Sequence, residues 1–80
     1  MPHVNLKIAA GRSDVIKHEL AEAIADDLVR IAGANPAQIS VAIEDVEPKN
    51  WANDVYDVEI APKAECLYRR PGYDPEDLPR

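Results

Sequence analysis

The chain begins with a short segment in which apolar and polar residues alternate. Between residues 3 and 9 the apolar positions are Val4, Leu6 and Ile8, with polar residues standing between them. A period of two that includes β-branched residues predicts a strand with one half-buried face. Gly11 indicates where this strand ends.

The next segment repeats its apolar residues at steps of three and four. Ser13 stands at the position of a helix N-cap, and Asp14 places a negative charge in the first turn. Gly33 stands where a helix of about twenty residues would end. We therefore predict an amphipathic helix between these residues, with an apolar stripe made of Ile16, Leu20, Ala23, Ile24, Leu28 and Ile31.

A second alternating segment follows the helix. Ile39, Val41 and Ile43 are separated by Ser40 and Ala42, which predicts a second strand. A strand, a helix and a strand in this order predict a right-handed β-α-β unit with parallel strands, and hence an α/β (α+β) fold. One helix covers one face of a two-stranded sheet, so we expect another subunit to cover the other face.

The pattern weakens after residue 46. Residues 47–50 predict a turn or a short helix in front of Trp51. Further apolar positions recur at three- and four-residue steps, at Val55, Val58, Pro62 and Cys66. They predict a shorter C-terminal helix, with Pro62 in its first part or at a break. We expect residues 1–80 to form a single domain in which residues 74–80 are a flexible tail.

The small size of the chain favours self-association. A domain of 80 residues buries a modest share of its surface and usually needs a disulfide, a metal or a partner copy. Cys66 is the only cysteine, and His3 and His18 lack the spacing of metal ligands. We therefore expect a homo-oligomer that holds no metal.

Composition disfavours several classes of function. The formal net charge of −6 disfavours nucleic acid as a partner, because phosphate groups repel an acidic protein. No apolar run approaches the roughly 20 residues that span a bilayer, and the first residues lack the regions of a signal peptide. A single unpaired thiol is typical of a reducing compartment, so we expect a cytoplasmic protein with no membrane partner.

Pro2 is the candidate catalytic residue. Removal of Met1 would leave Pro2 with a free secondary amine, a base that a proline inside a chain lacks. An ordinary terminal amine has a pKa near 8, and an apolar pocket or a nearby guanidinium lowers that pKa. The alternative is that Pro2 simply starts the first strand, a position that proline tolerates.

Several stretches of the chain occur together at a characteristic spacing. They are Pro2, His3 and Val4 at the start of the first strand, the run Gly11, Arg12, Ser13 and Asp14, the amphipathic helix, and the strand around Val41. Together these features resemble the 4-oxalocrotonate tautomerase family. Trp51 and the sequences EIAP at residues 59–62 and RPGY at residues 70–73 are similar to a short bacterial branch of that family, described as dimeric.

The resemblance implies an isomerase, an intramolecular oxidoreductase that interconverts the keto and enol forms of a small unsaturated or aryl-enolpyruvate acid. In that family the N-terminal proline, here Pro2, is the base, and no cofactor takes part. Arg12 stands where the family has an arginine that binds the substrate carboxylate, and its guanidinium suits such an anion; a solvated loop residue is the alternative. Trp51 stands where members carry an aromatic wall, although a lone Trp is as often a packing residue.

Ser40 marks a departure from the family pattern. In the hexameric members the second strand carries an arginine that polarises the 2-keto oxygen, and Ser40 stands at that position here. A hydroxyl donates one hydrogen bond but supplies no positive charge, so we expect poor turnover of the namesake substrate. Arg69 or Arg70 of a partner subunit is one candidate replacement. For His3, on the polar face of the first strand, we favour a surface or interface position, with a place near the site as the alternative.

Two classes of function therefore compete. The first is a cofactor-independent keto–enol tautomerase, acting as a homo-oligomer in which a dimer is favoured over a hexamer. The second is a non-catalytic oligomeric module of the same fold that binds a small acid or another protein. A retained Met1 and the missing second arginine would favour this module. Water addition, as in dehalogenating relatives, ranks lower because the extra carboxylate and arginine residues of those relatives have no equivalents here.

Overall fold

The computed structural model describes all residues from Met1 to Arg80. They form two compact units, residues 1–45 and residues 46–80, which are described one at a time. The first unit contains β1 (His3–Ala9), α1 (Asp14–Ala32), the short 3₁₀ helix η1 (Pro36–Gln38) and β2 (Ser40–Val46), whose last residue begins the second unit.

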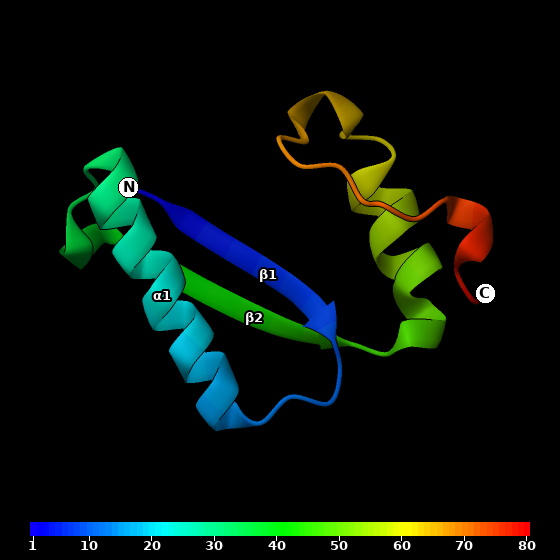
Figure 1. Cartoon of the computed structure of the whole chain (residues 1–80), viewed down its shortest axis with the longest axis horizontal. Helices are drawn as coiled ribbons and strands as arrows, with labels where there is room; N and C mark the ends of the chain where they lie inside the picture. The colour runs from blue at the N-terminus through cyan, green and yellow to red at the C-terminus, as the bar shows by residue number, and fades with distance from the viewer. The chain divides into compact units, whose positions relative to one another are not determined.

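The two strands form a two-stranded parallel sheet. β1 and β2 are hydrogen-bonded neighbours, and Figure 1 shows them running in the same direction with α1 alongside. The pairing begins before β1 itself, because the backbone N–H of Ser40 donates to the carbonyl of Pro2 at 3.2 Å. The predicted β-α-β unit is confirmed.

The ends of α1 lie where the sequence predicts them. The Ser13 hydroxyl accepts a hydrogen bond from the backbone N–H of Ile16 at 3.3 Å, as an N-cap does. Gly33 ends the helix in the left-handed conformation at φ 69°, which costs a residue without a side chain little. Its N–H donates to the carbonyl of Val29 at 3.1 Å, so the last turn keeps its hydrogen bonds.

The apolar stripe of α1 is only partly covered. Leu20, Ile24 and Leu28 are half-buried, as expected for side chains over the sheet. Ala23 is exposed, and Ile16 and Ile31 keep 44% and 71% of their surface accessible, so these members of the predicted apolar stripe are not covered in the single chain. Two strands are too narrow to shield a stripe of this width and length.

The second unit is built from short helical segments. The 3₁₀ helix η2 (Pro48–Asn50) confirms the predicted short helix before Trp51. The π-helix η3 (Ala52–Ile60) follows, and two further 3₁₀ helices are η4 (Ala64–Cys66) and η5 (Pro75–Asp77). The wide turn of η3 is seen at its end, where the N–H of Ala61 donates to the carbonyl of Tyr56 at 2.9 Å, five residues back.

The C-terminal helical segment is broken around Pro62, which is one of the two predicted arrangements, and it resumes only as the short η4. Pro62 and Cys66 lie outside η3, which ends at Ile60. Proline has no backbone N–H to continue the hydrogen-bond ladder of a helix, so the three- and four-residue spacing did not extend the helix through it. The interpretation of residues 1–80 as one domain with a flexible tail at 74–80 stays a prediction.

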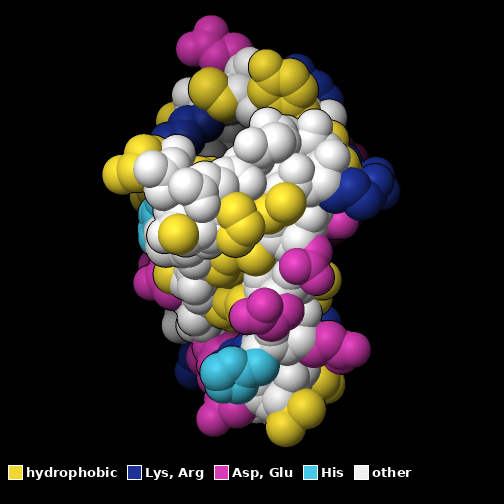
Figure 2. Space-filling view, turned by 90° about the vertical axis from the view of Figure 1, so that its left-hand side faces the viewer, with side chains coloured by type: hydrophobic (Ala, Val, Ile, Leu, Met, Phe, Trp, Pro, Cys, Tyr) yellow, Lys and Arg dark blue, Asp and Glu magenta, His cyan; other side chains and the backbone are white.

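Very little of the single chain is buried. Ala52 and Val55, exposed by 0% and 5%, make up the buried apolar core. By contrast, Val15 is 77% exposed and Val58 is 54% exposed. Figure 2 shows apolar side chains gathered on the face that it views, with acidic side chains beside them. No helix has both the length and the apolar character required to cross a membrane.

Candidate active site

The paired strand ends bring Pro2 next to Ser40. The hydrogen bond from the Ser40 backbone to the Pro2 carbonyl, 3.2 Å long, fixes this register. Pro2 is half-buried, whereas Ser40 is exposed. Two of the four predicted site residues, Pro2 and Ser40, therefore lie together within one chain although they are far apart in the sequence.

His3 joins this pair. Its Nδ1 lies 2.6 Å from the Oγ of Ser40, a hydrogen-bond distance. From the sequence, a surface or interface position was favoured for His3 over a place near the site, and the residue is indeed exposed. The parity of the two strands could have indicated the contact, because residues paired across a sheet point to the same face. The register that sets this pairing was not predicted.

The same face of the sheet carries a second polar pair. The side-chain amide of Asn5 donates to the Glu44 carboxylate at 2.9 Å. Asn5 follows His3 by two residues on β1, and Glu44 follows Ser40 by four on β2. The face thus carries two cross-strand hydrogen bonds between exposed side chains, one of them beside Pro2.

Arg12 lies at the opposite end of β1. Its Nη1 donates to the carbonyl of Ala9 at 2.8 Å, and the residue is exposed. The seven residues of β1 separate it from Pro2, which corresponds to roughly 20 Å of extended chain. The guanidinium has five N–H groups, so this contact leaves donors for a ligand. One small acid cannot contact Pro2 and Arg12 of the same chain.

Trp51 is held within the second unit. Its indole N–H donates to the hydroxyl of Tyr73 at 3.0 Å. The ring of Tyr73 in turn contacts that of Tyr56, with centroids 6.1 Å apart and planes tilted by 53°. These contacts orient the indole, and Trp51 remains partly exposed. Trp51 and Pro2 belong to different units of the chain.

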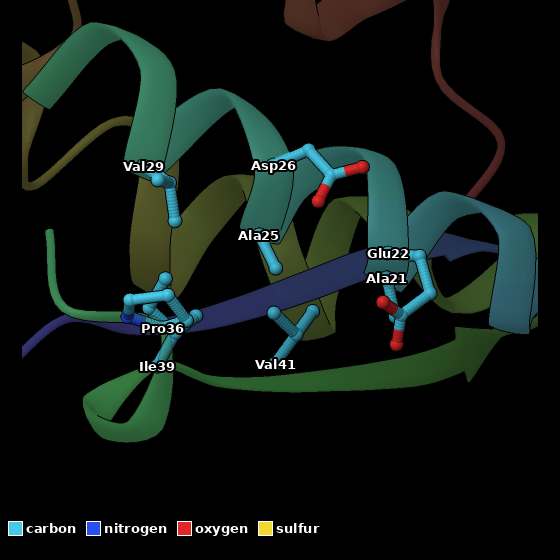
Figure 3. A pocket seen from close by; sticks show the side chains of 8 residues that line it. All are labelled: Ala21, Glu22, Ala25, Asp26, Val29, Pro36, Ile39 and Val41. Atoms are coloured by element: carbon cyan, nitrogen blue, oxygen red, sulfur yellow. The ribbon is translucent and has the colours of Figure 1, made fainter. Parts of the chain in front are cut away.

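A hollow of about 430 Å³ lies between α1 and the start of β2. Figure 3 shows that α1 and the segment of residues 36–41 both contribute apolar side chains to the lining, and that α1 also contributes two carboxylates. The lining consists of Ala21, Glu22, Ala25, Asp26, Val29, Pro36, Ile39 and Val41. None of the four predicted site residues lines it. The two carboxylates disfavour an anionic ligand, so this hollow does not suit a small acid.

A two-pronged ion pair lies in the second unit. Arg80 donates to both oxygens of Asp57, at 2.8 and 3.2 Å, and to the side-chain oxygen of Asn53 at 3.1 Å. These hydrogen bonds hold the pKa of the Asp57 carboxyl below its usual value and raise the pKa of Arg80. The carboxylate and the guanidinium form a structural pair at the end of the chain.

The side chains of the described chain include no group of three or more His, Cys, Asp and Glu residues that could hold a metal ion. The residues gathered at the strand ends are instead a proline, a histidine and a serine. They offer hydrogen-bond donors and acceptors and, if Met1 is removed, an amine.

Comparisons with known proteins agree on the kind of protein this chain resembles. The family model described as "Tautomerase enzyme" matches residues 2–57. A protein of Xylella fastidiosa strain 9a5c named "Probable tautomerase" is 42% identical over 73 residues, which cover 91% of this chain and 89% of that protein. Tautomerase PptA of Cronobacter sakazakii is 35% identical over 75 residues, covering 92% of this chain and 99% of the relative.

A solved structure matches the fold as well. The 4-oxalocrotonate tautomerase isozymes of Methylibium petroleiphilum include a chain that superimposes with a TM-score of 0.60 at 26% identity. The superposition covers 62% of this chain and 81% of the other. The two sequence relatives extend over more of this chain than that structure does, so the similarity to them includes part of the second unit.

Proposed function

The chain belongs to the tautomerase family, and on that premise we propose that it is a cofactor-independent keto–enol tautomerase with Pro2 as its general base. The substrate class is a small 2-hydroxy or 2-keto acid that is unsaturated or carries an aryl-enolpyruvate group. The observation that carries the proposal is the position of Pro2, which starts the family match and lies beside Ser40.

The chemistry requires the removal of Met1. While Met1 precedes it, the nitrogen of Pro2 is an amide and has no basicity. The Met1 side chain is 95% exposed, so an aminopeptidase would have access to it. The trimmed chain would then begin with a secondary amine whose ring limits its rotation, which favours a fixed position for the base.

The amine moves one proton. Its neutral form takes a proton from the substrate, and the negative charge that remains spreads over the enolate. The protonated amine then returns the proton to another atom of the conjugated system. The substrate gains and loses one proton, and the base is regenerated. An amine with a pKa near the working pH performs both steps well.

The developing charge needs a donor, and Ser40, whose backbone is bonded to Pro2, is the candidate. Its hydroxyl would donate to the 2-oxygen of the substrate as negative charge grows there. Arg12 would bind the substrate carboxylate through two parallel hydrogen bonds. A neutral donor stabilises an oxyanion less than a guanidinium does, so substrates whose enolate is delocalised into an aryl group are favoured.

Arg12 would have to come from a second copy of the chain. Roughly 20 Å of extended strand separates Arg12 from Pro2 in one chain. Two copies with their β1 strands side by side and antiparallel would place Arg12 of one near Pro2 of the other, twice, by two-fold symmetry. The nearly absent core of a single chain supports self-association independently. We favour a dimer, with Trp51 in the wall of the shared site.

The proposal is tested on protein whose trimmed N-terminus has been verified by intact-mass spectrometry. We expect Pro2→Ala to lower kcat/KM for the enol form of phenylpyruvate at least about tenfold, because a primary amine on a flexible residue is less well positioned. A variant that retains Met1 is the matched control and should be inactive. Unchanged turnover in Pro2→Ala would remove this residue from the mechanism. Trimmed wild-type protein that binds small acids without turnover would instead indicate a binding module.

A further inference from the structure

We propose that His3 is a positioning residue for the reaction: it orients the Ser40 hydroxyl so that its proton faces the 2-oxygen of the substrate. This inference rests on the proposed function and adds a residue to it. The contact that motivates it is the 2.6 Å hydrogen bond between His3 Nδ1 and Ser40 Oγ.

The pair lies beside the proposed base. The backbone N–H of Ser40 donates to the Pro2 carbonyl at 3.2 Å, and the Ser40 side chain is hydrogen-bonded to the ring of His3. Both bonds hold Ser40 against the first two residues of the trimmed chain. A substrate atom that contacts the Pro2 amine would therefore lie close to this hydroxyl.

The direction of the His3–Ser40 bond decides what the hydroxyl can do. If Nδ1 accepts, the hydroxyl proton points at the ring and is not available to a substrate. If Nδ1 carries a proton and donates, the serine oxygen accepts, and its own proton is free to turn towards the substrate. The second arrangement is the productive one.

The His3–Ser40 bond is expected to contribute little to stability. His3 and Ser40 are both exposed, and a hydrogen bond in contact with water adds little to stability. The bond between Asn5 and Glu44, at 2.9 Å, is a similar cross-strand contact on the same face of the sheet. It lies farther along the strands from Pro2, so it serves as the matched control.

The experiment compares variants of the trimmed, oligomeric protein with the enol of phenylpyruvate as substrate. We expect His3→Ala and Ser40→Ala each to lower kcat about tenfold with KM changed by less than about twofold, because the bond acts on the transition state. The double variant should be no slower than the slower single variant, since the two residues act as a unit. His3→Asn should recover most of the rate, because its amide nitrogen can occupy the place of Nδ1.

Asn5→Ala should keep kcat within about twofold of the wild-type value. The inference is overturned if His3→Ala keeps the wild-type kcat, if the two single losses multiply in the double variant, or if Asn5→Ala loses as much as His3→Ala. Trimmed wild-type protein that turns over no enol overturns the proposed function and this inference together. Normal turnover that depends on Pro2 but not on His3 overturns the inference alone.

Discussion

At the scale of single residues, three of the four candidate site residues lie near the ends of β1. Pro2 begins the strand pairing, and Ser40 and His3 are bonded to each other beside it. Arg12 lies beyond the other end of β1, where one of its N–H groups donates to the Ala9 carbonyl. The proposed base and the proposed anion-binding cation thus occur in the same chain but are separated by the length of a strand.

Substitution of Arg12 should affect binding more than turnover. We expect Arg12→Ala to raise KM about tenfold while kcat falls much less, because a charged hydrogen bond to the carboxylate is made in both the ground state and the transition state. Steady-state kinetics of the trimmed protein measure both constants. Arg12→Lys keeps the charge but loses the two-pronged geometry, so its KM should lie between the KM of the wild type and that of Arg12→Ala. Equal KM values for all three proteins would make Arg12 a surface residue.

At the scale of elements, capping residues set the ends of α1, and an ion pair joins Arg80 to Asp57 of η3 in the second unit. Ser13 and Gly33 could be predicted from the sequence because each acts on the few residues next to it. The extent of η3 could not, because the spacing of Val55, Val58 and Pro62 left open whether the helix contains Pro62 or breaks there, and the structure has the break. The contact of Arg80 with Asp57 joins residues far apart in sequence and left no local signal.

Loss of the helix cap should lower stability by a measurable amount. We expect Ser13→Ala to reduce the free energy of unfolding by about 1 kcal/mol per chain, because the N–H of Ile16 loses its acceptor. Urea denaturation followed by circular dichroism measures the change. Ser13→Asp retains a side-chain acceptor and should stay close to the wild type. The capping role would be refuted if both variants lost the same amount.

The pair of Arg80 and Asp57 should make stability depend on acid pH. Because the folded-state pKa of Asp57 is lowered by its hydrogen bonds with Arg80, the stabilisation is present above the ordinary value near 4 and is lost as the pH falls through the lowered pKa. We expect Arg80→Ala to be less stable than the wild type at pH 7 and equally stable in strong acid. Urea midpoints at several pH values test this, and a constant difference at all pH values would contradict it.

At the scale of the whole molecule, the single chain has a very small core, and the site proposed for it is incomplete without a second copy. Ala52 and Val55 are its buried apolar residues. In our proposal a second copy of the chain both buries apolar surface and supplies the missing site residue. An antiparallel pair of β1 strands would complete two sites at once, each with Pro2 from one chain and Arg12 from the other.

Subunit mixing tests whether the site is shared. Trimmed Pro2→Ala and Arg12→Ala proteins are each expected to be slow at substrate concentrations well below KM. After subunit exchange, half of the dimers should be mixed, and each mixed dimer contains one intact site. The mixture should therefore reach about a quarter of the wild-type rate. Mixing Pro2→Ala with the double variant is the control and should restore nothing. A rate equal to the mean of the two separate variants would argue for sites within single chains.

The sequence by itself determined the elements of the first unit, the caps of α1 and the candidate base Pro2, because periodicity, capping and residue chemistry depend on neighbours in the chain. The tertiary structure decided which residues meet. The pairing register of β1 and β2 brings Ser40 to Pro2 and His3 to Ser40, and the extended strand keeps Arg12 away from them. Such contacts follow from strand pairing between distant segments, and a shift of one residue would turn every side chain to the other face.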